Sequence, residues 1–328
     1  YLELDTPALS PTLIPETCLE VFKTQYISPW TEETTDLFLV PSPEVYIKPL
    51  IAQYKVNVVQ LSKCYRNCES MGRIHNPEFT MLEYYTMNAD YIESLEITEK
   101  LFSYLLPPVS KKEDFYASGR PPFVRLTMDE AFKQFAGFSI TECFPPNTED
   151  YADSKAIAEA VNKMAFHARG LGLTDPSSLP KTASFDNWTL EELYNLIFVH
   201  IVEPNLPKDK LIFLMDYPCF VSCLAQNLTQ KGLHKTYQKN LWKERWELYG
   251  NGIELANCYS EETNPLEVKK YFENEGKLKN QKSRIPHPIN QEYWKTFEEF
   301  PTCSGVAMGV DRLIAFLVGT KTIDGLLP

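Results

Sequence analysis

The chain has 328 residues, of which 44% are hydrophobic, and it carries a formal net charge of −12. This length and apolar content allow one large globular domain with an insertion, or two domains that share a core, and they exclude a disordered or fibrous protein. The acidic balance gives no broad basic field for nucleic acid, so a tRNA partner is not expected.

The eight cysteines are scattered, and their closest pairs, Cys64 with Cys68 and Cys219 with Cys223, lack the CxxC spacing of zinc knuckles and redox centres. We therefore expect reduced thiols in a cytoplasmic protein. No apolar run approaches the roughly 20 residues that span a bilayer. The acidic start of the chain also differs from a signal peptide, so a soluble protein is expected.

Residues 42–54 predict a helix that Pro49 should kink or divide. Two β-like runs follow at 56–67 and 78–87, and the polar loop between them predicts an antiparallel hairpin. Asp90 can cap a helix over residues 91–106, which Pro107-Pro108 should end.

Between about 107 and 210, Pro-rich joints such as Pro145-Pro146 separate helical stretches, which indicates a mainly helical insertion. Strands are expected at 210–218 and 246–259, with a tight turn at Asn251-Gly252 in the second. Asn264-Pro265 should begin a helix. The pattern favours an α+β fold with a mainly antiparallel sheet flanked by helices.

The strand at 78–87 would place Phe79, Met81, Glu83 and Tyr85 on one face because its side chains alternate. On the partner strand, Arg66 could clamp a phosphate or a carboxylate while Phe79 stacks on a base. The alternative is an ordinary half-buried sheet face.

Residues 252–262 contain Glu254, Asn257 and Glu261. Carboxylates suit magnesium, which bridges nucleotide phosphates through one or two protein oxygens and several waters. The alternative is a set of solvated acidic side chains on an edge strand.

Residues 304–319 predict a strand that runs into a helix at Asp311. Gly305, Ala307 and Gly309 would keep this strand slim enough for a ligand to lie against it, or would allow tight helix packing. Arg312 stands in the first turn of the helix, against the macrodipole preference, which indicates a fixed anionic partner. The chain contains neither GxxxxGK[ST] nor GxGxxG, and it lacks HExxH.

Three stretches together resemble the motifs of class II aminoacyl-tRNA synthetases: LELDTPAL at 2–9, RNCESMGRIHNPEFTMLEYY at 66–85 and GVAMGVDRL at 305–313. With SPEVYIKPL and GIELANCYSEET, the chain is similar to lysyl-tRNA synthetases and most of all to their short paralogues, the elongation factor P lysine ligases. Two features favour the paralogues: Ala307 stands where the tRNA ligases have glycine, and the sequence has no N-terminal anticodon-binding barrel.

The resemblance implies one class II catalytic domain over 1–328 with a helical insertion at about 107–210, acting as a homodimer with ATP and Mg²⁺. It also implies activation of (R)-β-lysine or lysine as the adenylate and transfer to a lysine side chain of translation elongation factor P. Two alternatives stay open, a lysyl-tRNA synthetase core that charges tRNA and a catalytically silent paralogue that binds lysine or adenylate.

By the same resemblance, Arg66 and Arg312 are the catalytic residues. The resemblance also assigns residues to an ATP site, an amino-acid site and a metal site. A lysine-like substrate carries two ammonium groups, and each needs a charge-assisted acceptor once desolvated. The implied ATP site is Arg66, Asn67, Glu69, His75, Asn76, Phe79, Glu254, Leu255, Gly309 and Arg312. The implied amino-acid site is Ser42, Pro43, Glu44, Glu83, Tyr85, Asn257, Glu261 and Ala307, and the implied metal ligands are Glu254 and Glu261.

The chain departs from the family pattern at two positions. RNCESMG is one residue longer than the usual RNEEMG, so Cys68 or Glu69 could contact ATP, and we favour Glu69. Cys258 stands where the family usually has a glycine, and it could narrow the pocket or be silent.

Overall fold

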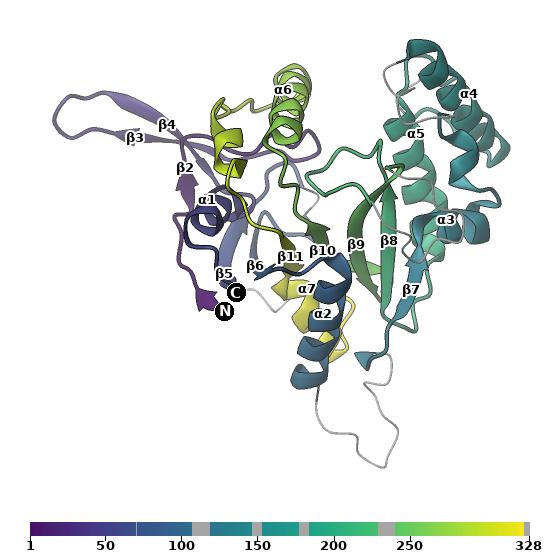
Figure 1. Cartoon of the computed structure of the whole chain (residues 1–328), viewed down its shortest axis with the longest axis horizontal. Helices are drawn as coiled ribbons and strands as arrows, with labels where there is room; N and C mark the ends of the chain where they lie inside the picture. Colours follow the sequence, from purple (N-terminus) through teal and green to yellow (C-terminus); the bar gives the residue numbers. More distant parts are fainter. Residues whose placement is uncertain (70, 107–118, 146–152, 177–183, 229–239, 325–328) are drawn as a thin grey trace. The chain divides into compact units, whose positions relative to one another are not determined.

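A computed structural model describes residues 1–69, 71–106, 119–145, 153–176, 184–228 and 240–324 (Figure 1). The chain divides into two compact units. Unit 1 comprises Tyr1–Pro121, Cys223–Gln226 and Leu255–Pro328, and unit 2 comprises Pro122–Ser222 and Asn227–Glu254. None of the helices in the described ranges is both long and apolar enough to cross a bilayer.

The strands of unit 1 form a sheet in the order β1 (Leu2–Glu3), β5 (Val58–Tyr65), β6 (Glu78–Met87), β11 (Cys303–Gly309) and β10 (Ile253–Ser260). β1 pairs with β5 in parallel, and the pairs β5–β6, β6–β11 and β10–β11 are antiparallel. The predicted hairpin and the predicted strand after residue 303 are therefore confirmed, within the α+β fold that was expected.

Helices α2 (Tyr91–Leu105) and α7 (Val310–Val318) cover one face of this sheet (Figure 1). The Asp90 side chain caps α2 through a capping box with Glu93, as predicted. The Ser94 hydroxyl of α2 shares a hydrogen bond with the Ser304 hydroxyl of β11. Pro107-Pro108, the predicted stop of this helix, lies outside the described residues.

Helix α1 (Glu44–Tyr54) continues unbroken through Pro49, so the predicted division at this proline is wrong. Proline has no N–H, which leaves the carbonyl of Val45 without its usual helical partner. The Tyr293 hydroxyl donates to this carbonyl and to that of Glu44, at 3.4 Å each. A side chain distant in the sequence therefore satisfies the carbonyl that the proline leaves open.

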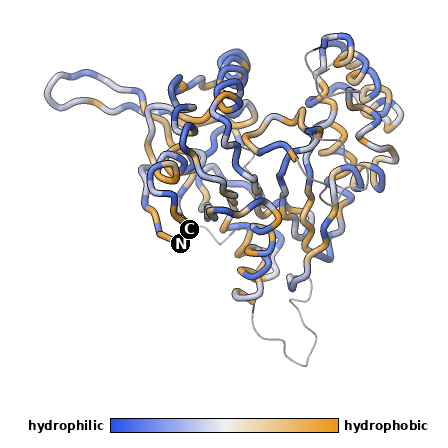
Figure 2. Tube along the Cα trace, in the orientation of Figure 1, coloured by the Kyte–Doolittle hydropathy of each residue, from blue (hydrophilic) through white to orange (hydrophobic). Residues whose placement is uncertain are grey.

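Helix α6 (Pro265–Lys282) begins at Asn264-Pro265 as predicted, and the Asn264 side chain accepts from the backbone N–H of Leu266. Most of α6 is hydrophilic (Figure 2), and Val268 and Phe272 are among its few apolar side chains that enter the core. They join a cluster with residues of α1 and with Tyr293 of the 3₁₀-helix η7 (Tyr293–Phe297).

A second, three-stranded sheet of unit 1 has the order β2 (Leu9–Ser10), β4 (Thr34–Leu39) and β3 (Lys23–Ile27), all antiparallel. Figure 1 shows the β3–β4 hairpin projecting beyond α1. The sequence analysis did not predict these strands. Every residue of β3 is exposed, so the strand carries no alternation of buried and exposed positions that could reveal it.

Unit 2 contains β7 (Val124–Thr127), β8 (Ile212–Pro218) and β9 (Trp242–Gly250). β8 pairs in parallel with β7 and in antiparallel fashion with β9. The strand expected at 210–218 is confirmed, whereas β7 lies in the stretch for which only helices were expected. Asn251 and Gly252 have φ angles of 54° and 74°, as the predicted tight turn after β9 requires.

The helical elements of unit 2 lie mainly where the helical insertion was expected. Its α-helices are α3 (Met128–Ala131), α4 (Ser154–Gly170) and α5 (Leu190–Ile197). Two π-helical segments, η2 (Phe132–Ala136) and η5 (Phe198–Val202), continue α3 and α5, and the 3₁₀-helices are η3 (Ile140–Cys143) and η6 (Glu203–Asn205). Of the predicted joint Pro145-Pro146, the second residue lies outside the described ranges.

Candidate active site

One face of the unit 1 sheet collects several of the predicted amino-acid-site residues. Glu83 of β6 lies opposite Ala307 of β11, and Ala307 lies opposite Asn257 of β10. In the neighbouring row, Tyr85 lies opposite Gly305. Because directly opposed residues share a face of an antiparallel sheet, these five residues point the same way. The predicted grouping of Glu83 and Tyr85 on one face is confirmed.

The segment that begins α1 closes over this face. Ser42 Oγ donates a 2.5 Å hydrogen bond to Glu83 Oε1, and the backbone N–H of Glu44 donates to Ser42 Oγ at 3.1 Å. The Tyr85 hydroxyl donates to Glu83 Oε2 at 3.2 Å. Pro43 is the N-cap residue of α1. The structure thus brings Ser42, Glu44 and Tyr85 together around the buried carboxylate of Glu83.

A buried lysine that the sequence analysis did not include lies in the same cluster. Lys48 is fully buried, its Nζ is 2.8 Å from Glu261 Oε2, and it also pairs with Glu44 one helical turn earlier. The i,i+4 spacing of Glu44 and Lys48 is the sequence signal that could have identified it. Glu261 is itself 2% exposed, so it is not the solvated edge-strand carboxylate of the alternative interpretation.

Burial raises the pKa of several carboxyl groups in this cluster. The pKa of Glu83 rises to about 8, because burial and the charge of Glu44 outweigh the hydrogen bonds from Ser42 and Tyr85. The pKa of Glu261 rises to about 7 through burial, which Lys48 opposes. Glu16, which the sequence analysis also missed, reaches about 7 by burial and the charge of Glu44. Such a cluster favours a bound cation, because a cation stabilises the ionised carboxylates.

Gly305 leaves room for the side chains around it. A Cβ at this position would overlap Glu261 Oε1 and the ring of Tyr85, so no larger residue fits without a shift. The space above Gly305 is therefore filled by the chain's own side chains. At Gly309 a Cβ would meet nothing closer than Arg312 Cδ at 3.8 Å and the Leu255 carbonyl oxygen at 3.9 Å. This end of β11 is the more open one.

The predicted ATP residues gather at the loop between β5 and β6. The Arg66 guanidinium carbon lies 5.1 Å from the centre of the Phe79 ring. Burial lowers the pKa of His75, and the charges of Arg312 and Arg66 lower it further, while Glu69 opposes them. Arg312 Nε donates to the Ile74 carbonyl at 3.2 Å. These residues thus lie within electrostatic reach of one another.

The extra residue of RNCESMG is accommodated at Cys68. This residue has a φ of 58° and an exposed side chain, and its backbone N–H donates to Asn67 Oδ1 at 2.8 Å. Glu69 is half-buried, and its charge acts on His75. The geometry therefore favours Glu69 over Cys68 as a nucleotide contact. The Asn76 side chain donates to the Glu78 carbonyl at 2.9 Å, which holds the other end of the loop.

Cys258 lies on the opposite face of the sheet. It is paired with Val306, one position out of phase with Asn257, and it is buried. Its Sγ interacts with Ser94 of α2, whose hydrogen bond lowers the thiol pKa while burial raises it. A side chain on this face cannot narrow the amino-acid pocket, so of the two outcomes considered above the structure favours the silent one.

The two predicted metal ligands have different surroundings. Glu254 is the second residue of β10 and belongs to unit 2, whereas Glu261 follows that strand in unit 1 and contacts Lys48. Within the described ranges, no group of three or more His, Cys, Asp and Glu side chains is arranged to hold a metal ion. At nucleotide sites magnesium usually takes most of its ligands from phosphate and water.

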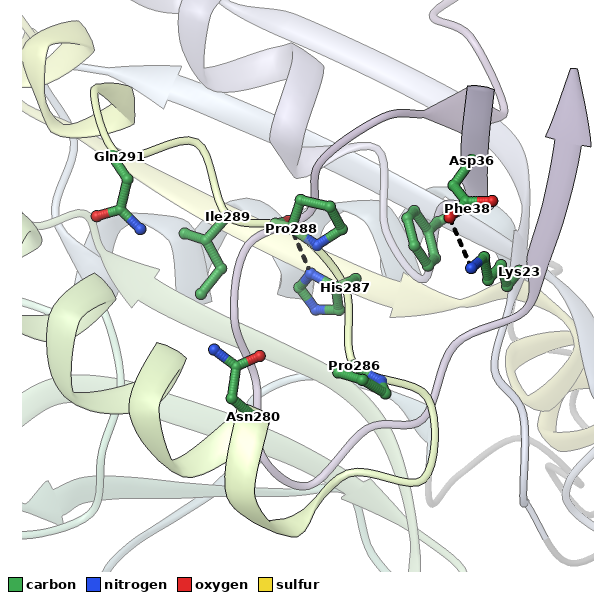
Figure 3. A pocket seen from close by; sticks show the side chains of 9 residues that line it. All are labelled: Lys23, Asp36, Phe38, Asn280, Pro286, His287, Pro288, Ile289 and Gln291. Carbon is green, nitrogen blue, oxygen red and sulfur yellow. Dashed lines mark hydrogen bonds and ion pairs between the residues drawn. The ribbon is translucent and has the colours of Figure 1, made fainter. Parts of the chain in front are cut away.

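A cavity of about 360 Å³ lies elsewhere in unit 1 (Figure 3). None of the predicted site residues lines it. Its wall includes Phe38 and His287, whose Nδ1 lies 3.0 Å from the Pro288 carbonyl oxygen, and the Lys23–Asp36 ion pair stands at its edge. This cavity is separate from the residues that the sequence singled out.

The candidate site has one arginine, Arg66, next to a strand-loop-strand unit and another, Arg312, at a strand-helix junction. The family model described as tRNA synthetases class II (D, K and N) matches residues 1–328. The chain belongs to this family. Membership implies ATP-dependent activation of an amino acid, and proteins of this class generally use ATP and Mg²⁺.

Proposed function

We propose that the chain activates lysine or (R)-β-lysine as the aminoacyl-adenylate and transfers it to a lysine side chain of translation elongation factor P. The observation that carries the proposal is the cluster of Glu44, Glu83 and Glu261 on one side of the candidate site, in which Glu83 and Glu261 are buried and Glu44 is partly buried. Within a D, K and N family, three carboxylates against one ammonium repel an aspartate side chain and favour a substrate with amines.

The remaining assignments follow from the position of this cluster. The substrate amines would lie against the carboxylates, with Ser42, Pro43, Tyr85, Asn257 and Ala307 as neighbours. Its carboxylate would point toward Arg66, whose fork suits both a carboxylate and a phosphate. Adenine would stack on Phe79 near His75, and the phosphates would reach Arg312. The proposed ATP contacts also include Asn67, Glu69, Asn76, Glu254, Leu255 and Gly309.

In the first step, a substrate carboxylate oxygen attacks the α-phosphorus of ATP, and pyrophosphate leaves in line. The carboxylate is already ionised at neutral pH, so this step needs no general base. Arg66 and Arg312 would orient the phosphates and stabilise the charge that develops on their oxygens. Magnesium, when bound near Glu254, would supply further charge stabilisation to the phosphates. Because Glu261 contacts Lys48, we assign it to the amino-acid pocket in preference to the metal.

In the second step, the acceptor amine attacks the carbonyl carbon of the adenylate, and AMP leaves. The amine must first lose a proton, since the ordinary pKa of a lysine is about 10.4. We propose a protein acceptor over tRNA because the net charge of −12 opposes binding of an extended nucleic-acid backbone, which carries many phosphates. The first of the three class II motifs, which residues 2–9 resemble, builds the dimer interface in this class, so we also propose a homodimer. We propose that it works in the cytoplasm, as the scattered cysteines led us to expect.

An acceptor test distinguishes these possibilities. The protein is incubated with ATP, magnesium and either lysine isomer, together with elongation factor P or bulk tRNA, and intact masses are recorded. A mass gain of one lysyl group on the factor, greater with the β-isomer, is the expected result. Charging of tRNA would identify a lysyl-tRNA synthetase core. ATP binding without pyrophosphate exchange would identify a silent paralogue and would overturn the proposal.

A further inference from the structure

We propose that Lys48 is a positioning residue that sets the charge of the amino-acid pocket. Its ammonium occupies the cation position between Glu44 and Glu261, which leaves Glu83 to receive an ammonium group of the substrate. This inference rests on the proposed function, because it specifies how the charges of the same pocket match the charges of its ligand.

The geometry assigns Lys48 to both carboxylates at once. Its side chain has no exposed surface, and its Nζ lies 2.8 Å from Glu261 Oε2 while it also pairs with Glu44 on its own helix. Glu44 belongs to α1 and Glu261 follows β10, so one ammonium joins two elements that line the pocket. Glu83 has different partners, since it accepts from Ser42 and Tyr85.

Burial explains why the lysine is needed. An ionised carboxylate that leaves water costs several kcal/mol unless a counter-charge and hydrogen bonds compensate it. Burial lowers the pKa of Lys48, but the charges of Glu261 and Glu44 outweigh burial and hold this pKa well above its ordinary value. Lys48 is therefore a permanent cation next to Glu44 and Glu261, and its charge opposes the effect of burial on the pKa of Glu261.

The charges of the pocket also match the proposed substrate. Glu83 holds a proton in the free pocket, and an ammonium group of the substrate favours its ionised form. With Glu83 ionised, the carboxylates of Glu44, Glu83 and Glu261 and the ammonium of Lys48 leave two negative charges uncompensated. A lysyl-adenylate presents two ammonium groups to this pocket. No free carboxylate offsets their charge, because the carboxylate has been joined to AMP. The pocket is then neutral as a whole. Without Lys48 a third negative charge would remain, and the cluster would favour a foreign cation in place of the lysine ammonium.

Substitution of Lys48 by alanine tests this inference, because it leaves a cavity and the groups that filled it are known. The change removes three methylenes and an ammonium, and n-propylammonium contains the same groups. We expect the KM for lysine to rise about tenfold while the KM for ATP changes less than about twofold. Propylammonium chloride should restore much of the lysine KM and raise the melting temperature of Lys48→Ala, because a ligand that binds only the folded state stabilises it.

Two control variants separate charge from shape. Lys48→Met keeps the chain length without the ammonium, so it should lose lysine affinity as Lys48→Ala does but should gain nothing from propylammonium. Lys55→Ala removes a lysine just after the same helix, whose ion pair with Glu299 is exposed. It should match wild type with and without propylammonium. If Lys48→Ala does not fold, the lysine KM of Lys48→Met decides the question.

The outcomes distinguish this inference from the proposed function. If no amino acid supports ATP–pyrophosphate exchange by the wild-type protein, the proposed function is refuted. The melting shift of Lys48→Ala with propylammonium then still decides the role of Lys48. A wild type that activates lysine, with an unchanged lysine KM in Lys48→Met and no propylammonium effect in Lys48→Ala, overturns the role of Lys48 alone.

Discussion

The guanidinium carbon of Arg66 lies 5.1 Å from the centre of the Phe79 ring, and Arg66 Nε is buried without a hydrogen-bond partner within the described part of the chain. An unsatisfied buried donor is costly, so its retention here indicates a group that awaits a ligand. A phosphate or carboxylate oxygen is the partner that a guanidinium accepts most readily.

Arg66→Lys should therefore lose most of the pyrophosphate exchange although the positive charge is kept. Lysine lacks the planar fork that binds two oxygens at once. We expect kcat to fall about 100-fold, the typical effect of losing one donor aimed at developing charge. Lys63→Ala serves as the control, because the ion pair of this neighbouring cation with Glu78 is exposed. Near-normal exchange by Arg66→Lys would show that Arg66 does not contact the reacting groups.

Gly305→Ala should destabilise the fold by about 1–3 kcal/mol, the usual cost of overpacking. Its Cβ would overlap Glu261 and Tyr85, both of which we propose as part of the amino-acid pocket. Gly309→Ala is the matched control on the same strand, since its Cβ would have nothing nearer than 3.8 Å. Thermal melts of both variants test the comparison. Equal melting temperatures would mean that the space above Gly305 can expand freely.

The stability of the protein should fall as the pH rises from about 4.5 toward about 8, in part because of Glu83. Its pKa is raised from 4.5 to about 8 in the folded state, so the folded state holds the proton more tightly. The contribution is complete below pH 4.5 and is lost as the pH rises through the folded pKa. The slope for one such group reaches about 1.4 kcal/mol per pH unit.

Denaturant unfolding of Glu83→Gln at several pH values measures this effect. The variant should lose less stability than wild type over the same range, because the amide does not titrate. Glu261 and Glu16 shift in the same direction, so some of the pH dependence should persist. Glu78→Gln, an exposed position of the same strand, should have the slope of wild type. Parallel curves for Glu83→Gln and wild type would contradict the buried, protonated state of Glu83.

Cys258→Gly should leave the KM for lysine unchanged and should lower stability by about 1 kcal/mol. The thiol is on the face of the sheet opposite the pocket, and glycine within a strand increases the entropy of the unfolded chain and removes a packed side chain. Steady-state exchange kinetics and denaturant unfolding together check both parts. A changed lysine KM with unchanged stability would place Cys258 in the pocket.

Sequence patterns predicted the elements whose signals are local. The cap at Asp90, the turn at Asn251-Gly252 and the alternation along β6 each depend on neighbouring residues alone, and the structure confirms them. Strand β3 was missed because all of its side chains are exposed.

Other features depend on partners that are remote in the sequence. Pro49 does not end its helix because Tyr293 satisfies the carbonyl that the proline leaves open. Lys48 of helix α1 is buried against Glu261, which follows strand β10, whereas a lysine in an amphipathic helix is ordinarily expected at the surface. The sequence therefore predicted the carboxylates of the candidate pocket but not the ammonium of Lys48 that lies among them.

The most direct measurement is ATP–pyrophosphate exchange by the wild-type protein with lysine, (R)-β-lysine, aspartate and asparagine in turn. The acidic pocket predicts exchange with the two lysine isomers and background rates with aspartate and asparagine. Exchange that depends on aspartate or asparagine, with none for either lysine isomer, would contradict the assignment of Glu44, Glu83 and Glu261 to substrate ammonium groups.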